Sequence, residues 1–418
     1  MIISITVVKN LRYGLIVGLL SVVLVFFQNC SQGIQQVDQL SSQATSEIQQ
    51  GTGGNNTQQP VTNTPSTQSG TTVVQSGTTT TDPGSATKPT QLFGVGFRKG
   101  ADAAERKKMA EIIASRGFKI VRMGFNWDND YSVFRDQLIQ LKNVGVKAEV
   151  ILFTSYQYIS ACTTDPAAAE QDAYNQTYKM ADGLKDLVTD FELANETSLR
   201  PELRAEVETN TATTSSAYYN KTCYAMRAGV LKGMARAIKD VRVASGIALR
   251  SIMGTVGRDF AFLRFLQEKG VDFDVVGYHI YPLYGQKDLN TDPWFGTGGL
   301  FNQLAAFNKK VHLNEFNCAE TYNAAYDDQP GSALTEDCYR SIKKHMDGII
   351  KQKIVDIEYI MFYEFINNPS KAAPENHFGL MYDINTPKIQ ISLASSFAGG
   401  VLSTSEKNIL IQRGLLSP

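Results

Sequence analysis

Short apolar runs alternate with longer amphipathic segments from about residue 91 to the end of the chain. The short runs are apolar almost throughout, which is typical of parallel strands that are buried on both faces. The longer segments place their apolar residues at helical spacing. The predicted strands are 92–97, 118–127, 147–154, 190–197, 247–255, 273–282, 310–317 and 357–365.

A helix is expected behind each of these strands. The predicted helices are 101–116, 133–142, 172–188, 216–241, 259–269, 300–308, 334–351 and, as the closing element, 388–398. Eight strand–helix units are the count of a (β/α)8 or TIM barrel. A doubly wound open sheet is the alternative, but it would carry a GxGxxG fingerprint after the first strand, and GVGFRKG at 94–100 does not fit. We therefore predict an α/β fold, a (β/α)8 barrel, over residues 90–418.

The N-terminal segment has a different pattern. Lys9 and Arg12 precede an apolar run over 13–27, and Cys30 follows closely. A run of this length matches the apolar region of a signal peptide and is shorter than the roughly 20 residues of a spanning helix. A cysteine directly after such a run resembles a bacterial lipobox. We expect residues 1–30 to be a signal segment with Cys30 as the lipidated N-terminus; an ordinary secretory signal and an uncleaved anchor are the alternatives.

Residues 31–89 consist mostly of Gln, Ser, Thr, Gly and Asn. Such a composition buries too little apolar surface to offset the entropy of ordering, so a disordered linker is expected. Random-coil scaling gives it a mean reach of roughly 40 Å, enough to hold a domain clear of a membrane. The expected protein is exported and tethered to the bacterial cell envelope through its lipid anchor, with free secretion as the alternative.

Charge and cysteines narrow the chemistry. The formal net charge of −1, from 40 Lys and Arg against 41 Asp and Glu, gives no sign of a nucleic-acid partner, and we expect a monomer. Apart from Cys30, the cysteines are even in number, which suits disulfides in an oxidising compartment. Three pairings are possible, and the economical one joins Cys162 to Cys223 and Cys318 to Cys338. The chain has no CxxC motif and its four His are scattered, so neither a metal site nor a cofactor is expected.

Polar residues gather where the predicted strands end, which is where barrels of this kind place their active sites. The 190–197 strand ends in Asn195-Glu196, and the 310–317 strand carries Glu315 near its end. These two strands would face each other across the barrel mouth. Hydrolysis of a glycosidic bond needs two such carboxylates, one to protonate the leaving oxygen and one to attack the anomeric carbon. An isolated Asn-Glu dipeptide is weak evidence, so this hypothesis depends on the order of the strands.

These residues resemble the clan A retaining glycoside hydrolases, the (β/α)8 superfamily of cellulase-like and β-xylosidase-like enzymes, over about residues 91–400. In that clan the fourth strand ends in Asn-Glu, which matches Asn195-Glu196 and implies that Glu196 is the acid/base. The nucleophile ends the seventh strand, which matches Glu315 in HLNEF.

Further matches concern the neighbours of the nucleophile. The resemblance implies that Arg122, on the second strand, lies near Glu315. It also implies that His279 and Tyr281 are the His-x-Tyr of the sixth strand, with the Tyr bonded to the nucleophile. The clan often ends the eighth strand in a Trp under the sugar; here the sequence is MFYEF, so Tyr363 or Phe365 would take that place.

The roles are physically coherent. Arg122 beside Glu315 would depress the pKa of that carboxylate and keep it ionised as a nucleophile. Trp127 and Trp294 would suit stacking on sugar rings, although aromatics in loops are about as often plain packing residues. Taken alone, Arg122 would equally suit an ion pair with an acid in a loop. His279, taken alone, would equally suit a hydrogen-bonded residue of the core.

The sequence therefore predicts a retaining glycosidase that acts on an extracellular or periplasmic poly- or oligosaccharide. The alternative is a catalytically inactive carbohydrate-binding lipoprotein with the same barrel.

Overall fold

The computed structural model describes residues 91–418 except 99, 127–129, 156–161, 163–164 and 200–213. The predicted signal segment, Cys30, the predicted linker and Trp127 therefore lie outside the described residues. Within the described part of the chain, none of the helices combines the length and apolar character needed to cross a membrane.

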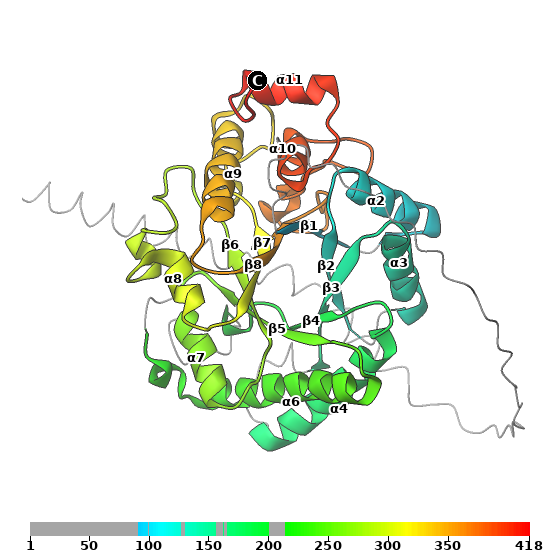
Figure 1. Ribbon diagram of the computed structural model, residues 1–418, viewed down its shortest axis with the longest axis vertical. Helices are drawn as coiled ribbons and strands as arrows, with labels where there is room; N and C mark the ends of the chain where they lie inside the picture. The colour runs from blue at the N-terminus through cyan, green and yellow to red at the C-terminus, as the bar shows by residue number, and fades with distance from the viewer. Residues whose placement is uncertain (1–90, 99, 127–129, 156–161, 163–164, 200–213) are drawn as a thin grey trace, which may run out of the picture. The chain divides into compact units, whose positions relative to one another are not determined.

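Eight parallel strands form a closed barrel in which each strand pairs with the next one and the last pairs with the first (Figure 1). The predicted barrel is confirmed. The strands are β1 (Leu92–Gly96), β2 (Ile120–Phe125), β3 (Lys147–Leu152), β4 (Asp190–Leu193), β5 (Arg250–Val256), β6 (Val275–Ile280), β7 (Lys310–Phe316) and β8 (Ile357–Phe362).

Helices surround this barrel and pack their apolar faces against its strands in one continuous core. They are α2 (Ala103–Ser115), α3 (Tyr131–Asn143), α4 (Pro166–Leu184), α6 (Thr222–Ser245), α7 (Phe260–Glu268), α8 (Gly299–Ala305), α9 (Ala333–Lys351), α10 (Ile389–Ala398) and α11 (Thr404–Gln412). Single 3₁₀ turns lie at η2 (Thr197–Leu199), η3 (Ser216–Tyr219), η4 (Pro293–Phe295), η5 (Ala319–Tyr322) and η6 (Glu375–His377).

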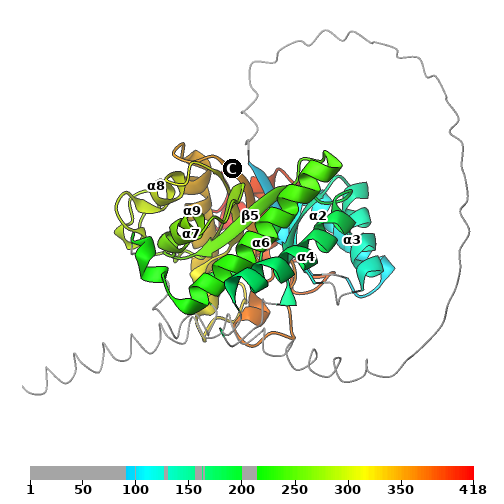
Figure 2. The same cartoon turned by 90° about the horizontal axis from the view of Figure 1, so that it is seen from below.

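The two longest neighbouring helices, α4 and α6, run side by side along one flank of the barrel (Figure 2). Their close approach depends on glycine. A Cβ on Gly229 would collide with the carbonyl oxygen of Pro166, and one on Gly233 with that of Glu170. A side chain at either position would force the two helices apart.

Three expectations about helices were wrong. The 216–241 helix is divided, because η3 covers Ser216–Tyr219 and α6 begins only at Thr222. Helix α4 begins at Pro166 rather than at residue 172, because Asp165 caps it by accepting hydrogen bonds from the backbone N–H groups of Ala167 and Ala168. The chain does not close with the 388–398 helix. Helix α11 follows, started by a capping box between Ser403 and Glu406.

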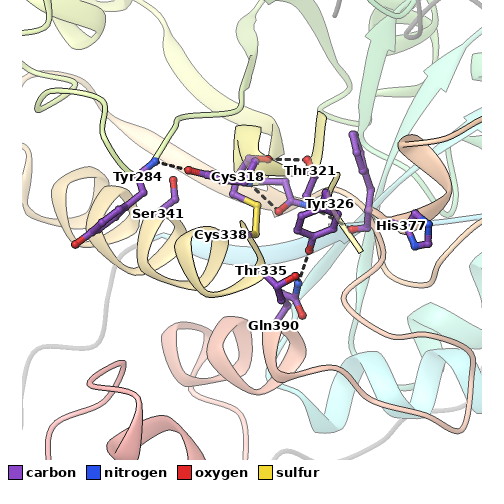
Figure 3. Close-up of a disulfide and its surroundings, with 12 residues drawn as sticks. Tyr284, Cys318, Thr321, Tyr326, Thr335, Cys338, Ser341, His377 and Gln390 are labelled. Atoms are coloured by element: carbon purple, nitrogen blue, oxygen red, sulfur yellow. Dashed lines mark hydrogen bonds between the residues drawn. A yellow bond between two sulfur atoms is a disulfide. The ribbon is translucent and has the colours of Figure 1, made fainter. Parts of the chain in front are cut away.

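Two disulfides join segments near the C-terminal ends of the strands, and they are the pairs expected from the sequence. Cys162–Cys223 links the segment after β3 to the start of α6, with 4.9 Å between the Cα atoms. Cys318–Cys338 links the segment after β7 to α9, at 5.2 Å, and Figure 3 shows it beside Thr321, Thr335 and Ser341, which are buried. The disulfides indicate an oxidising environment.

A buried charged network occupies the N-terminal end of the barrel. His312 on β7 lies between two acids, with Nδ1 2.6 Å from Glu149 and Nε2 3.2 Å from Glu358. Arg250 binds Glu358 at 2.6 Å and Asp190 at 2.7 Å. We call these five residues the basal network.

Candidate active site

The two glutamates singled out by the sequence lie close together at the C-terminal ends of their strands. Glu196 follows β4 and Glu315 lies on β7, and their carboxylate oxygens come within 4.8 Å of each other. His279, on β6, lies beside both. Its Nδ1 is 3.0 Å from Glu196 Oε1 and 3.6 Å from Glu315 Oε2.

Tight backbone turns bring Glu196 to this position. After β4 ends, Ala194 (φ 61°) and Glu196 (φ 43°) take left-handed conformations that non-glycine residues adopt rarely. Each costs on the order of 1 kcal/mol or more, so the surrounding structure must hold them. Part of that support comes from Ser198 in η2, whose hydroxyl donates to Asp259 at 2.7 Å. Asp259 is fully buried and also accepts a bond from Tyr219 at 3.4 Å.

Arg122, on β2, connects these elements inside the barrel. Its Nε and Nη2 donate to the two oxygens of Glu192, at 2.5 and 2.9 Å. Nη1 donates to Glu315 Oε1 at 2.6 Å, and Nη2 also donates to Asn195 Oδ1 at 2.7 Å. Burial would lower the pKa of Arg122, but Glu192 and Glu315 raise it well above its usual value. The guanidinium is therefore a fixed positive charge.

Glu315 accepts a hydrogen bond on each oxygen. Arg122 binds Oε1, and the Tyr281 hydroxyl donates to Oε2 at 2.5 Å. Burial alone would raise the pKa of Glu315, but His279, Arg122 and Tyr281 together hold it below its usual value. The carboxylate is thus ionised, oriented and suited to nucleophilic attack.

His279 is completely buried, and its two nitrogens face different partners. Arg122 Nη2 lies 3.3 Å from Nε2, but both of its N–H groups are already donated to Glu192 and Asn195. Nδ1 faces Glu196, and because an ionised carboxylate only accepts, Nδ1 must donate. The proton of a neutral imidazole is then on Nδ1, where it is donated to Glu196. Burial lowers the pKa of His279, but Glu315 and the bond to Glu196 outweigh it and the pKa is raised.

We call the connected polar residues at this end of the barrel the mouth network: Arg122, Glu192, Glu196, His279, Tyr281 and Glu315.

The aromatic residues expected to bind sugar are placed differently. Tyr363 follows β8, and its ring lies perpendicular to that of Tyr281 at 6.5 Å between centroids. Trp294, in the loop after β6, is 42% exposed, and Arg258 stacks over its ring at 4.9 Å. No contact between Trp294 and the mouth network is found among the described residues.

Sequence reasoning missed Glu192, which holds Arg122 in place. A signal for it was present. Asp190 and Glu192 are two acids in an otherwise apolar strand, and a buried acid needs a cationic or hydrogen-bonding partner. Asp259 and Ser198 were also missed, because neither lies in a motif.

Glu196, His279 and Glu315 also form a group that could in principle ligate a metal ion, since their donor atoms lie within 4.8 Å of one another. Two observations speak against it. Both oxygens of Glu315 already accept hydrogen bonds, and the guanidinium of Arg122 lies 2.6 Å from one of them. The positive charge of Arg122 repels a cation at this place.

No model of a known protein family matches the sequence, and no curated protein matches it either. Solved structures do match. A family 1 β-glucosidase from Thermotoga maritima superposes with a TM-score of 0.52 at 13% sequence identity, covering 78% of this chain and 98% of that chain. A structure of β-glucosidase from the same organism in complex with deoxynojirimycin gives a TM-score of 0.54 at 11% identity, covering 78% of this chain and 99% of that chain. At such low identity the similarity concerns the fold alone: the chain has the (β/α)8 barrel of these β-glucosidases, the fold that its sequence resemblance implies.

Proposed function

We propose that the protein is a retaining glycoside hydrolase that cleaves O-glycosidic bonds of a poly- or oligosaccharide outside the cytoplasm. The observation that carries the proposal is the approach of the Glu196 and Glu315 carboxylates to within 4.8 Å. Retaining enzymes hold their two carboxyl groups about 5–5.5 Å apart, whereas inverting enzymes separate them by about 6.5–9.5 Å to admit a water molecule.

In the first step Glu315 attacks the anomeric carbon while Glu196 gives its proton to the glycosidic oxygen. The bond from the anomeric carbon to that oxygen breaks, and an ester bond to Glu315 forms. Arg122 and Tyr281 orient the attacking carboxylate, one on each oxygen. His279 holds Glu196 through the 3.0 Å contact.

In the second step Glu196 removes a proton from a water molecule, which attacks the anomeric carbon. The ester bond breaks and Glu315 leaves as a carboxylate, again stabilised by Arg122 and Tyr281. Two displacements restore the original anomeric configuration. The β-glucosidase fold supports this scheme, because such barrels place catalytic groups at the C-terminal ends of their strands.

The proposal includes the N-terminal organisation expected from the sequence: a signal segment over 1–30, lipidation at Cys30 and a linker over 31–89 that tethers the barrel domain of residues 90–418. The disulfides support an exported protein. The inactive carbohydrate-binding barrel is disfavoured, because the two carboxylates face one another beside a shared histidine rather than pointing apart.

The test compares two variants on a panel of polysaccharides and aryl glycosides. Glu315→Gln is expected to lower kcat by about 10⁴-fold or more, because it removes the nucleophile. Glu196→Ala is expected to lose about 10²–10⁴-fold on substrates with poor leaving groups. Added azide should restore its turnover of activated aryl glycosides and yield a glycosyl azide of retained configuration, read by NMR.

Glu111→Gln is the control, since Glu111 is exposed on α2 and forms a surface pair with Lys107. Its activity should equal that of the unchanged protein, and EDTA should inhibit neither. Full activity of Glu315→Gln on any glycan that the unchanged protein hydrolyses would contradict the proposal.

A further inference from the structure

Lys388, the residue that precedes the first turn of α10, is a buried cation that the mechanism above does not use. Its side chain is 1% exposed, and its ammonium group lies 2.9 Å from Asp328 Oδ2. The same group donates to Asn367 Oδ1 at 2.7 Å and to the backbone carbonyl oxygen of His377 at 2.9 Å. An ammonium group has three N–H donors, so each of them has an acceptor.

Asp328, in the segment between β7 and α9, contacts the same residues from the other side. Its Oδ2 accepts a hydrogen bond from Asn367 Nδ2 at 3.1 Å and lies 3.0 Å from His377 Nδ1. Its backbone carbonyl oxygen accepts the hydroxyl of Tyr382 at 2.8 Å. We call Asp328, Asn367, His377 and Lys388 the Asp328 cluster. It joins the segment after β7, the segment after β8 and the start of α10.

The central pair of this cluster is charged at neutral pH. Burial lowers the pKa of Lys388 to about 8, against the opposing effects of Asp328 and Glu364. Burial would raise the pKa of Asp328, but Lys388, Asn367 and His377 hold it below its usual value. The two opposite charges are shielded from water, where their attraction is stronger than at the surface.

The cluster ends beside an aromatic residue that packs against the mouth network. Phe378 directly follows His377, and the centroid of its ring lies 6.1 Å from that of Tyr281. The ring of Phe378 also packs edge-on against Tyr322 at 4.8 Å and against Tyr363 at 6.1 Å.

These rings surround Tyr281, which directly follows β6. The ring of Tyr281 lies perpendicular to that of Tyr322 at 5.2 Å and to that of Tyr363 at 6.5 Å. Its hydroxyl donates to Glu315 Oε2 at 2.5 Å. The direction of this hydroxyl is set by the torsions of the tyrosine side chain, which the surrounding rings restrict.

The backbone around Phe378 is fixed at two places. Its own carbonyl oxygen accepts hydrogen bonds from Asn317 Nδ2 and from the backbone N–H of Glu364, both at 3.1 Å. Lys388 binds the carbonyl oxygen of the preceding residue, His377. Loss of one of these two anchors should therefore shift the ring of Phe378 rather than release it.

We propose that Lys388 and Asp328 are positioning residues of the active site. Through the backbone of His377 and the ring of Phe378, they hold the Tyr281 hydroxyl on the nucleophile. This inference rests on the proposed glycosidase activity and deepens it, since it assigns residues outside the mouth network that control the nucleophile.

The experiment is a double-mutant cycle on the full-length protein, with a 4-nitrophenyl glycoside that the unchanged protein hydrolyses. Tyr281→Phe removes the hydroxyl and is expected to lower kcat about 10²-fold. Lys388→Met should lower kcat about tenfold and change KM less than about twofold, because the hydroxyl acts mainly in the transition state. Added to Tyr281→Phe, Lys388→Met should lower kcat by less than about twofold more, because the group that it positions is already gone.

The acid limb of the kcat/KM profile gives a second readout, because it follows the pKa of Glu315. His279, Arg122 and Tyr281 together hold that pKa below its usual value. A weaker bond from Tyr281 should therefore move the acid limb of Lys388→Met to higher pH. In the unchanged protein Lys388 stays charged over this limb, since its own pKa is about 8.

Phe378→Leu is a second variant, in case Lys388→Met does not fold. It removes the ring beside Tyr281 without leaving a buried charge unpaired, and it should change kcat and the acid limb in the same direction. Thermal unfolding monitors both variants, and kcat is taken per folded molecule.

Arg116→Met is the matched control. Arg116 also pairs with an acid from another part of the chain, Glu406. It lies between α2 and β2, at the N-terminal ends of the strands and away from Tyr281. The kcat and the acid limb of this variant should equal those of the unchanged protein.

The outcomes separate the two proposals. Losses from Lys388→Met and Tyr281→Phe that add in free energy, or an acid limb that neither Lys388→Met nor Phe378→Leu moves, would overturn the inference and leave the glycosidase proposal intact. No turnover of any glycoside by the unchanged protein, together with no labelling of Glu315 by 2-deoxy-2-fluoro glycosyl fluorides, would overturn the glycosidase proposal and this inference with it.

Discussion

The barrel holds two buried histidine–carboxylate networks, one at each end. In the basal network His312 lies between Glu149 and Glu358, at 2.6 and 3.2 Å. In the mouth network His279 lies between Glu196 and Glu315, at 3.0 and 3.6 Å. Both histidine side chains are fully buried, and both networks contain an arginine that binds two acids. By composition the two networks are nearly equivalent.

They differ in the balance of charge and in their place along the barrel. Glu358, with 19% of its side chain exposed, accepts bonds from Arg250, Lys310 and His312, and Glu149 is sealed in the barrel with one oxygen that accepts no hydrogen bond from the described residues. Glu196, with 13% of its side chain exposed, pairs with His279 at the C-terminal ends of the strands, where such barrels place their active sites. The comparison teaches that neither residue types nor exposure alone identify a catalytic network; its position at the C-terminal ends of the strands does.

The sharpest test of this comparison makes the same substitution in both networks. His279→Leu is expected to lower kcat by about 10²-fold, because Glu196 loses the donor that positions it. His312→Leu is expected to lower the free energy of unfolding by about 3–5 kcal/mol, because Glu149 is left buried without its partner, while kcat per folded molecule stays unchanged. Urea unfolding and active-site titration measure the two effects. Equal losses of kcat in both variants would show that the distinction between the networks is wrong.

A smaller effect is expected from the support of the acid/base turn. Asp259→Asn weakens the hydrogen bond that the Ser198 hydroxyl donates to this residue. The carboxyl group of Glu196 should then be positioned less accurately, and kcat should fall about tenfold on alkyl glycosides. Aryl glycosides with good leaving groups need less proton donation and should be affected less, which a merely unstable protein would not show. Asp136→Asn is the control, because Asp136 pairs with Arg106 between α2 and α3. A uniform loss across leaving groups would speak against the positioning role.

The smallest effect concerns the pH dependence of stability. Burial lowers the pKa of His312, but Glu149 and Glu358 outweigh it and the pKa is raised above 6.5. The folded state therefore holds this proton more tightly than the unfolded state does. The resulting contribution to the free energy of unfolding is complete below pH 6.5 and is lost as the pH rises through the pKa of His312 in the folded state. The unfolding free energy of the unchanged protein should fall relative to His312→Leu by at most about 1.4 kcal/mol per pH unit. If the unfolding free energies of the two proteins changed in parallel from pH 6 to 9, the assigned role of His312 would be refuted.

The sequence predicted the barrel and its strands because both faces of each strand are buried, and continuous apolar runs such as 147–154 are easily read. It also indicated which polar residues end these strands, and the structure brings Glu196, Glu315, Arg122 and Tyr281 together. Their catalytic roles remain a prediction.

Other parts of the site carried no comparable signal. Glu192 was read only as a strand position, since a strand pattern does not say which interior residues meet. Asp328 and Phe378 lie in loops without periodicity, and the contact between Phe378 and Tyr281 depends on how the segment after β8 folds back. Helix α11 was missed because its sequence has little amphipathic pattern and buries only Leu410.

The disulfide between Cys318 and Cys338 has a consequence for biosynthesis. Cys318 follows the strand that carries Glu315, and its backbone N–H is bound by Asn317, whose side chain also donates to the carbonyl oxygens of Tyr363 and Phe378. The crosslink to α9 thus completes the segment that joins the ends of β7 and β8. Because thiols stay reduced in the cytosol, this crosslink forms only in an oxidising environment. For the glycosidase that we propose, the segment beside Glu315 would then be crosslinked only there.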